Sequence, residues 1–249
     1  NVDVAFIVQS IGRDYSINRY ERYLAVVKNE NIKPVIIINK IDLIDESELE
    51  EKLAEIKTRL GEIDIIATSA KNDKGLEELK NYIKKGKTYC FLGSSGVGKS
   101  TLINKLLEKN SIKTGDVSSY SARGKHITTG REMYFLENGG IVIDNPGIRE
   151  VGMTDVSEGV SNLFDEISGL SEKCKFADCT HIHEPGCEVL RAVEDGELDR
   201  RRYENYINLK KETDYFQMSS LEKREKDRNF GKFIKNVKKD LKNAGHKNF

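Results

Sequence analysis

Short apolar runs alternate, over residues 1–109, with segments in which apolar residues recur every three or four positions. The runs are rich in β-branched residues and predict buried strands at 2–8, 34–39, 63–70 and 88–93. The periodic segments predict amphipathic helices at 17–31, 46–61, 75–86 and 99–109. This alternation predicts an α/β fold with a mostly parallel sheet that helices cover on both faces.

The pattern changes beyond residue 110. Residues 111–132 are rich in serine, glycine and threonine and predict a loop, whereas EMYFLE at 132–137 and GIVIDN at 140–145 predict a hairpin. From about residue 155 onward the periodicity is helical, with helices predicted at 159–167, 188–196, 199–212 and 220–243. We therefore predict an α/β domain over residues 1–153 and a small α-helical domain over residues 154–249.

Composition narrows the class of protein. The 249 residues carry no net formal charge although 33% of them are charged, so any contact with nucleic acid would depend on local patches. No apolar run approaches the ~18 residues of a membrane span, which predicts no membrane association. Four cysteines without a disulfide framework favour a reducing cytoplasm. Because the chain opens with Asn1 in place of methionine, we expect its natural N-terminus to be missing.

The segment GSSGVGKS at 93–100 matches the phosphate-loop pattern G-x-x-x-x-G-K-[ST] between a predicted strand and a predicted helix. Successive backbone N–H groups and the helix N-terminus would cradle phosphates. Lys99 would reach the β- and γ-phosphates, and the Ser100 hydroxyl would ligate Mg²⁺. The alternative is a glycine-rich turn without a ligand. The predicted phosphate-binding residues are Gly93, Ser94, Ser95, Gly96, Val97, Gly98, Lys99, Ser100 and Thr101.

The sequence NKID at 39–42 predicts selectivity for guanine. The Asp42 carboxylate can accept hydrogen bonds from N1–H and the 2-amino group of guanine, a pair of donors that adenine lacks. Asn39 and Lys40 would brace the loop. The alternative is an ordinary strand-to-turn edge, but Ser69, Ala70 and Lys71 follow the next predicted strand and form the usual second base-binding element. The alternative that the protein uses ATP would require both NKID and the Ser69-Ala70-Lys71 element to occur by chance.

The remaining GTPase elements follow the phosphate loop. In DNPG at 144–147, Asp144 would hold Mg²⁺ through water and the Gly147 N–H would contact the γ-phosphate. Thr128 or Thr129, within GKHITTG at 124–130, would supply the hydroxyl of switch one to Mg²⁺.

In an ordinary GTPase the two base-binding elements come last in the chain. Here NKID and SAK precede the phosphate loop, switch one and DNPG. This order predicts a circularly permuted P-loop GTPase fold that binds GTP or GDP. Because the chain runs from DNPG directly into the helical segment, we expect loss of the γ-phosphate to move residues 150–249.

A cluster of cysteine and histidine residues lies in CKFADCTHIHEPGC at 174–187. Three thiolates and one imidazole, from Cys174, Cys179, His181 and Cys187, suit a closed tetrahedral Zn²⁺ site, which would be structural. His183 is the competitor of His181. The alternative is three buried free cysteines beside exposed histidines.

With these residues in hand, the chain resembles the RsgA (YjeQ) family of circularly permuted, ribosome-associated GTPases. The resemblance covers residues 2–215 and rests on NKID, GSSGVGKST, GKHITT, GGIVIDNPGIRE and the cysteine cluster. It implies a factor that binds the small ribosomal subunit late in maturation and hydrolyses GTP there. It also implies an N-terminal OB-fold, which residues 1–249 do not include, and a threonine where Ile127 stands.

The residue after DNPG is Ile148, which cannot orient the attacking water as the glutamine of Ras-like enzymes does. We therefore expect slow intrinsic hydrolysis that the small subunit stimulates. His126 is similar to the proposed catalytic histidine of the family, and the alternative is an exposed loop histidine.

Residues 221–249 hold ten Lys/Arg and four Asp/Glu, a net charge of +6, with apolar residues at helical spacing. They predict a helix that packs on one side and meets rRNA phosphate on the other, or a plain solvated helix end. We expect a cytoplasmic monomer whose partners are the small subunit and its rRNA. The alternative function is a nucleotide-gated RNA-binding module in which hydrolysis is incidental.

Overall fold

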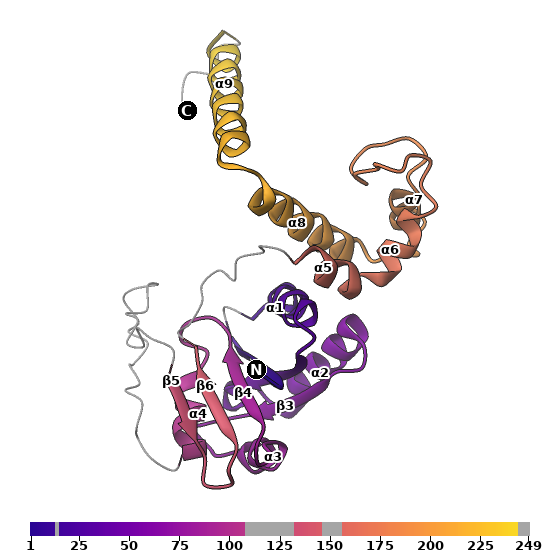
Figure 1. The fold of residues 1–249 in the computed structure, drawn as a ribbon. Coiled ribbons are helices and arrows are strands. Elements are labelled where there is room, and N and C mark those ends of the chain that lie inside the picture. The colour runs from indigo at the N-terminus through magenta and orange to yellow at the C-terminus, as the bar shows by residue number, and fades with distance from the viewer. Residues whose placement is uncertain (13–14, 108–131, 146–155, 244–249) are drawn as a thin grey trace.

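The computed structural model of the protein describes residues 1–12, 15–107, 132–145 and 156–243. Its centre is a six-stranded sheet in the order β3-β2-β1-β4-β6-β5 (Figure 1). Only β5 runs antiparallel to its neighbour among these strands, so the predictions of a mostly parallel sheet and of the hairpin are confirmed. The strands are β1 (Val4–Ser10), β2 (Lys33–Asn39), β3 (Asp64–Thr68), β4 (Thr88–Leu92), β5 (Glu132–Phe135) and β6 (Ile141–Asp144).

Helices cover both faces of the sheet, as the apolar runs predicted (Figure 1). Alternate residues of β1 point to opposite sides: Ala5 and Ile7 belong to the apolar cluster beneath α1 (Ile17–Asn29) and α2 (Glu46–Leu60). Phe6 and Val8 belong to the cluster beneath α3 (Leu76–Tyr82) and α4 (Lys99–Leu107). Strands buried on both faces read as continuous apolar runs, which is why they stand out in the sequence.

Parallel strands bring their carboxyl ends to one edge of the sheet, where open α/β folds bind ligands. Asn39 is the last residue of β2, Ser69 follows β3, Gly93 follows β4 and Asp144 is the last residue of β6. The topology therefore brings four segments that are far apart in the sequence to a single edge.

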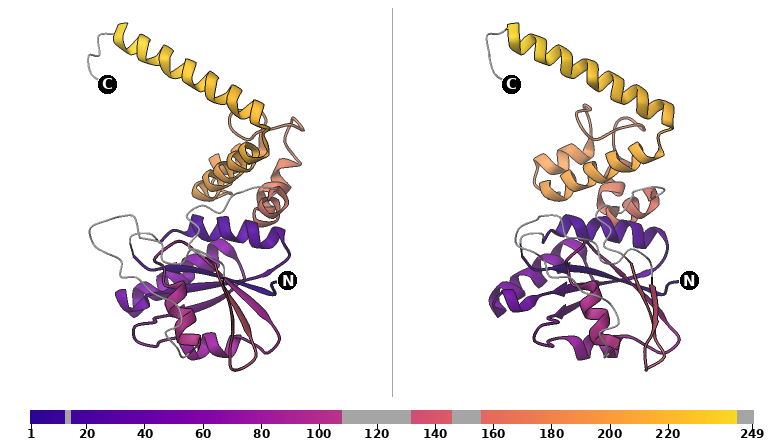
Figure 2. Two further views of the ribbon diagram at one scale, coloured as in Figure 1. Left: turned by 60° about the vertical axis from the view of Figure 1, so that its left-hand side comes forward. Right: turned by 90° about the vertical axis from the view of Figure 1, so that its left-hand side faces the viewer.

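Between residues 156 and 243 the regular elements are all helices, and a loop segment over 172–187 separates two of them. The helices are α5 (Ser157–Leu163), α6 (Asp165–Ser171), α7 (Glu188–Glu194), α8 (Arg200–Gln217) and α9 (Ser220–Asn243). One apolar cluster contains residues of α1 together with Val160, Phe164 and Tyr206. Figure 2 shows α1 lying between the sheet and these helices. The predicted boundary at 153/154 lies outside the described residues.

The prediction of one helix over 159–167 is wrong, because the helix breaks at Phe164 (φ −117°, ψ 48°). The break turns this side chain inward: Phe164 has no exposed surface, its ring lies 5.5 Å from the Tyr206 ring, and the Arg202 guanidinium lies 4.8 Å from its centre. Burial of an aromatic ring stabilises by about 2–3 kcal/mol, which outweighs the lost helical hydrogen bonding at one position.

Helix α9 extends away from the rest of the molecule in all views (Figures 1 and 2). Its Phe230 and Phe233 are 64% and 60% exposed, although apolar residues recur at helical spacing along it. Among the helices that the structure describes, none is both long enough and apolar enough to cross a bilayer.

Candidate nucleotide and metal sites

The phosphate loop leads from β4 into α4 in the backbone shape that its glycines permit. Gly98 has φ +101°, and a Cβ at this position would lie 2.2 Å from Asn39 Nδ2. The Lys99 ammonium donates hydrogen bonds to the carbonyl oxygens of Gly93 (2.9 Å) and Ser94 (3.0 Å). Burial lowers the pKa of Lys99 to about 8. A partly desolvated ammonium held inside a glycine-rich loop at the N-terminus of a helix is well suited to bind an anion.

The first base-binding element lies directly against this loop. The Asn39 side-chain amide donates to the Val97 carbonyl oxygen at 2.8 Å, and the Lys40 ammonium donates to the Gly96 carbonyl oxygen at 2.8 Å. Asn39 is itself held by Thr68, whose hydroxyl donates to Asn39 Oδ1 at 3.1 Å. The sequence analysis did not identify Thr68 as a site residue. Its position at the end of a buried strand, directly before Ser69, Ala70 and Lys71, is the signal that could have indicated it. The structure thus brings the predicted base and phosphate elements together.

The second base-binding element contacts the first through Asp42. The Ser69 hydroxyl donates to Asp42 Oδ1 at 2.6 Å and also accepts from the Asn72 N–H at 3.3 Å. Ser69 is fully buried, whereas Asp42 and Ala70 are half-buried and Lys71 is exposed. One carboxylate oxygen of Asp42 is therefore fixed in position while the group keeps access to the surface.

Asp144 supplies a buried carboxylate beside the phosphate loop. The Ser100 hydroxyl donates to Asp144 Oδ2 at 3.0 Å, whereas the buried Oδ1 has no hydrogen-bond partner. Burial raises the pKa of Asp144, although the hydrogen bond from Ser100 and the positive charge of Lys99 act to lower it. A buried carboxylate oxygen without a partner is costly unless a cation or water meets it. The residues Gly147, Thr128, Thr129 and His126 lie outside the described part of the chain.

The predicted cysteine and histidine residues come together in the helical segment. One ligand atom each from Cys174, Cys179, His181 and Cys187 lies within 4.8 Å of the others. Sγ of Cys174 lies 3.9 Å from Sγ of Cys187 and 3.7 Å from Nδ1 of His181, which lies 3.5 Å from Sγ of Cys187. Ligands placed tetrahedrally around zinc at ~2.3 Å for sulfur and ~2.0 Å for nitrogen would be separated by roughly 3.5–3.8 Å. The donor set and its spacing fit that ion.

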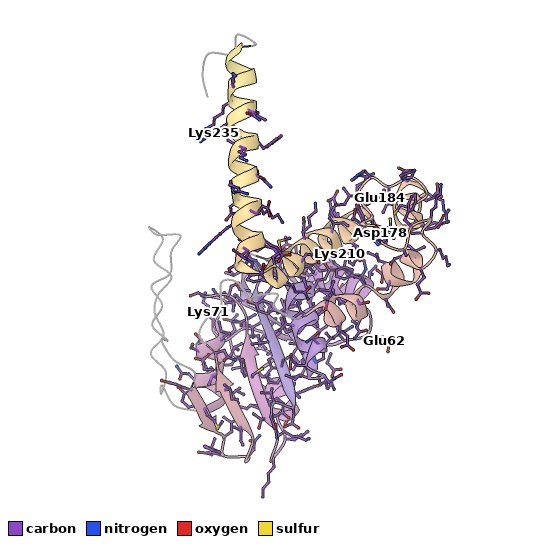
Figure 3. The ribbon with its side chains drawn as sticks, turned by 45° about the horizontal axis from the view of Figure 1, so that its top comes forward. Glu62, Lys71, Asp178, Glu184, Lys210 and Lys235 are labelled. Carbon is purple, nitrogen blue, oxygen red and sulfur yellow. The ribbon has the colours of Figure 1, made fainter. Side chains whose placement is uncertain are left out.

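Local structure holds this cluster in shape. Cys187 caps the N-terminus of α7 by accepting the Leu190 N–H at 3.4 Å. His181 is nearly buried with φ +63°, and its carbonyl oxygen accepts the Tyr203 hydroxyl at 2.6 Å. The competitor His183 is exposed. Figure 3 shows Glu184 and Asp178 in the loops of this cluster, well apart from Lys71 at the base-binding element.

Phosphate loop, base-binding elements and sheet order together define a P-loop nucleotide-binding protein of the circularly permuted GTPase type. The family model described as RsgA GTPase matches residues 1–154. The chain belongs to the RsgA GTPase family.

Known relatives match most of the chain. It is 42% identical over 240 residues to the small ribosomal subunit biogenesis GTPase RsgA 1 of Bacteroides thetaiotaomicron, covering 96% of this chain and 66% of the relative. It is 43% identical over 249 residues to the small ribosomal subunit biogenesis GTPase RsgA of Methanosarcina acetivorans. This match covers 98% of this chain and 66% of the relative. The chain therefore spans about two thirds of the length of these relatives.

Solved structures agree with this fold. The crystal structure of YjeQ from Thermotoga maritima matches with a TM-score of 0.61 at 34% identity, over 84% of this chain and 70% of that one. The structure of YloQ, described as a circularly permuted GTPase, matches with a TM-score of 0.58 at 29% identity. The match covers 86% of this chain and 69% of YloQ. The permuted GTPase fold predicted from the order of the motifs is confirmed.

Proposed function

We propose that this chain binds GTP and GDP with Mg²⁺ and hydrolyses GTP slowly on its own. The observation that carries this proposal is the direct contact of the base-binding element with the phosphate loop, through Asn39 to Val97 and Lys40 to Gly96. It places a carboxylate suited to guanine at a fixed position relative to an anion cradle. Asp42 would accept from the base, held by Ser69, and Ala70 and Lys71 would border the pocket.

The phosphates would lie in the cradle of residues 93–101, with Lys99 leaving its two carbonyl partners to meet them. The side chains of Ser100 and Asp144 fit a magnesium ion, because Asp144 Oδ1 is buried without a partner and Ser100 Oγ lies 3.0 Å from Oδ2. The ion would neutralise charge on the phosphates. We further propose Thr128 or Thr129 as its switch-one ligand, Gly147 as the γ-phosphate contact and His126 as the group that aids the attacking water.

The metal in the helical segment would be Zn²⁺ with a structural role. Four protein ligands leave no open position for a substrate. The loops between the ligands contain few buried apolar residues, so metal binding would contribute directly to their folding.

The partner that we propose is the small ribosomal subunit, because the relatives in this family are named for its biogenesis. Helix α9 supplies a second argument. Its exposed Arg228, Lys232, Lys235, Lys238 and Lys239 face solvent with no acidic residue between 228 and 239. Figure 3 shows Lys235 projecting from α9. Such a helix suits rRNA phosphate. We propose a cytoplasmic, monomeric maturation factor that GTP hydrolysis releases from the subunit.

The experiment that tests this function is GTP hydrolysis by the chain with and without purified small subunits. Stimulation by small but not large subunits is the expected result. Tight binding of GTP and of the subunit without stimulated turnover would contradict the hydrolysis step and favour a nucleotide-gated RNA-binding module. Failure to bind GDP more tightly than ADP would contradict the nucleotide assignment itself.

A further inference from the structure

The backbone of His181, one of the proposed metal ligands, adopts a conformation that residues with a side chain rarely take. Its φ is +63°, in the left-handed region, where the Cβ crowds the following carbonyl oxygen. The other described non-glycine residues with positive φ are Asn31, Lys40 and Asp73, and none of them is buried, whereas His181 is only 3% exposed. A strained and buried backbone of this kind persists only where neighbouring groups hold it.

The Glu184 carboxylate, in the loops of the metal cluster (Figure 3), holds the chain on both sides of His181. Its Oε1 accepts hydrogen bonds from the Thr180 hydroxyl and from the Thr180 N–H, the latter at 3.0 Å. Its Oε2 accepts from the N–H groups of Ile182 at 3.0 Å and of His183 at 3.1 Å. All four donors lie outside the His181 imidazole, so Glu184 acts on the backbone that carries this side chain.

Tyr203, on α8, holds the carbonyl side of the same residue. Its hydroxyl donates to the carbonyl oxygen of His181 at 2.6 Å. The peptide group between His181 and Ile182 is thus held at both ends, its C=O by Tyr203 and its N–H by Glu184. This peptide group cannot rotate without breaking two hydrogen bonds, so the backbone conformation of His181 is fixed by two side chains that belong to other segments.

The position of Tyr203 is set in turn by the packing of α8 against α1 and α2. The preceding residue, Arg202, donates to Oε1 of Glu21, which has no exposed surface, at 3.0 Å. It also donates to the carbonyl oxygens of Arg59 at 2.8 Å and Leu163 at 2.9 Å. Glu21 accepts two further hydrogen bonds from Arg59, at 3.0 Å and 3.2 Å. Because this buried ion-pair network holds the three helices in one arrangement, the Tyr203 hydroxyl meets the metal loop from a fixed support.

The conformation of His181 directs its imidazole at the cysteines. Its Nδ1 lies 3.7 Å from Cys174 Sγ and 3.5 Å from Cys187 Sγ, which is the spacing of ligands around one zinc ion. Since φ and ψ set the direction of the Cα–Cβ bond relative to the chain, a change to right-handed backbone would turn the imidazole away from these sulfur atoms. The groups that hold the backbone therefore also set the ligand geometry.

We propose that Glu184 and Tyr203 are positioning residues of the metal site: they hold His181 so that its imidazole completes the ligand set, and neither is itself a ligand. Glu184 does not belong to the group of four ligand atoms that lie within 4.8 Å of one another. This proposal rests on the proposed function, because it needs zinc in the cluster. Replacing groups that orient metal ligands typically lowers metal affinity by about 10–100-fold.

The test is the zinc affinity of the full chain, measured by competition with a chromophoric chelator in wild type and in single variants. Glu184→Gln keeps the size of the side chain, but its NH₂ group would face N–H donors and cannot accept from them. We expect its zinc affinity to fall about 10–100-fold. Tyr203→Phe removes only the hydroxyl and should lower the affinity about tenfold. Unchanged affinity in either variant would overturn the role of the residue that it replaces.

Glu188→Gln is the matched control. Glu188 directly follows the ligand Cys187, and its carboxylate accepts from Arg191 Nε at 2.8 Å instead of from the metal loop. The variant removes the same charge beside the cluster and should keep the zinc affinity of wild type. An equal loss of affinity in Glu188→Gln and Glu184→Gln would trace the effect to charge alone and would overturn the proposal.

Cobalt spectra separate a positioning role from ligation. Co²⁺ can replace Zn²⁺ in tetrahedral sites, and its visible d–d absorption depends on the ligand set. When saturated with Co²⁺, Glu184→Gln and Tyr203→Phe should show the absorption band of wild type, because the four ligands are the same. A shifted band would mean that the ligand set has changed and would overturn the proposal. Failure of wild type to bind Zn²⁺ would overturn the proposed metal site and this inference with it, whereas equally tight binding by wild type and both variants would overturn the inference alone.

Discussion

The side-chain amide of Asn39 donates to the main-chain oxygen of Val97 at 2.8 Å across 58 residues of sequence. This bond joins the loop that would select the base to the loop that would hold the phosphates. Because both loops follow parallel strands that are two places apart in the sheet, separated only by β1, their contact depends on strand order and not on the order of segments along the chain. The permuted sequence therefore reaches the geometry that the unpermuted order would give.

Base selection should depend on Asp42. Asp42→Asn should weaken GDP binding by at least about 100-fold, because the amide cannot accept from both N1–H and the 2-amino group. The same variant should gain affinity for xanthosine diphosphate, whose 2-oxo group accepts from an amide. Titration calorimetry with both nucleotides measures this exchange. The control is Asp45→Asn, which alters the N-cap of α2 three residues away and should leave selectivity unchanged.

Metal retention should distinguish the two histidines of the cluster. His181→Ala should lose bound zinc, since its Nδ1 lies 3.5 Å from Cys187 Sγ, whereas His183→Ala, at an exposed position, should retain it. Metal analysis of the purified variants, with the resistance of residues 174–187 to proteolysis as a second measurement, checks this. Retention of zinc by His181→Ala, or its loss from His183→Ala, would show that the ligands are assigned wrongly.

Lys99 should titrate near pH 8 only in the nucleotide-free protein. Burial lowers its pKa to about 8, and the phosphates of a nucleotide would raise it by stabilising the ammonium. Between pH 8 and the higher pKa of the complex, binding takes up a proton, so this group makes affinity fall as pH rises; well below pH 8 it contributes no pH dependence. NMR of ¹³Cε-labelled lysine should show a midpoint near 8 that disappears with GDP, and Lys99→Arg should remove this signal.

The close contact between α1 and α5 should make Gly159 intolerant of a side chain. Gly159→Ala places a methyl group 2.0 Å from the Ala25 carbonyl oxygen and should lower the free energy of unfolding by about 1–3 kcal/mol. Gly169→Ala in α6 meets nothing within 4 Å and should raise it by up to ~1 kcal/mol, as expected for a helix interior. Urea denaturation of both variants measures the difference, and equal effects would contradict the packing described here.

The strands, most helices and the meeting of the nucleotide-binding loops could be predicted from sequence, because apolar periodicity and strand ends are local signals. The role of Glu21 could not. Glu21 looks like an ordinary surface carboxylate on a helix, and it is buried only because Arg59 and Arg202 arrive from distant segments. The break at Phe164 is likewise set by tertiary packing.

Helix α9 is joined to α8 by Met218 and Ser219, with Met218 in extended backbone (φ −59°, ψ 138°). A helix of 24 residues is about 36 Å long, so a rotation of ~10° at this joint would move its far end by about 6 Å. Small changes of two dihedral angles at this joint would therefore sweep the basic residues of α9 through a wide arc. The position that those residues adopt would then be set by the surface of the proposed partner, not by α9 itself.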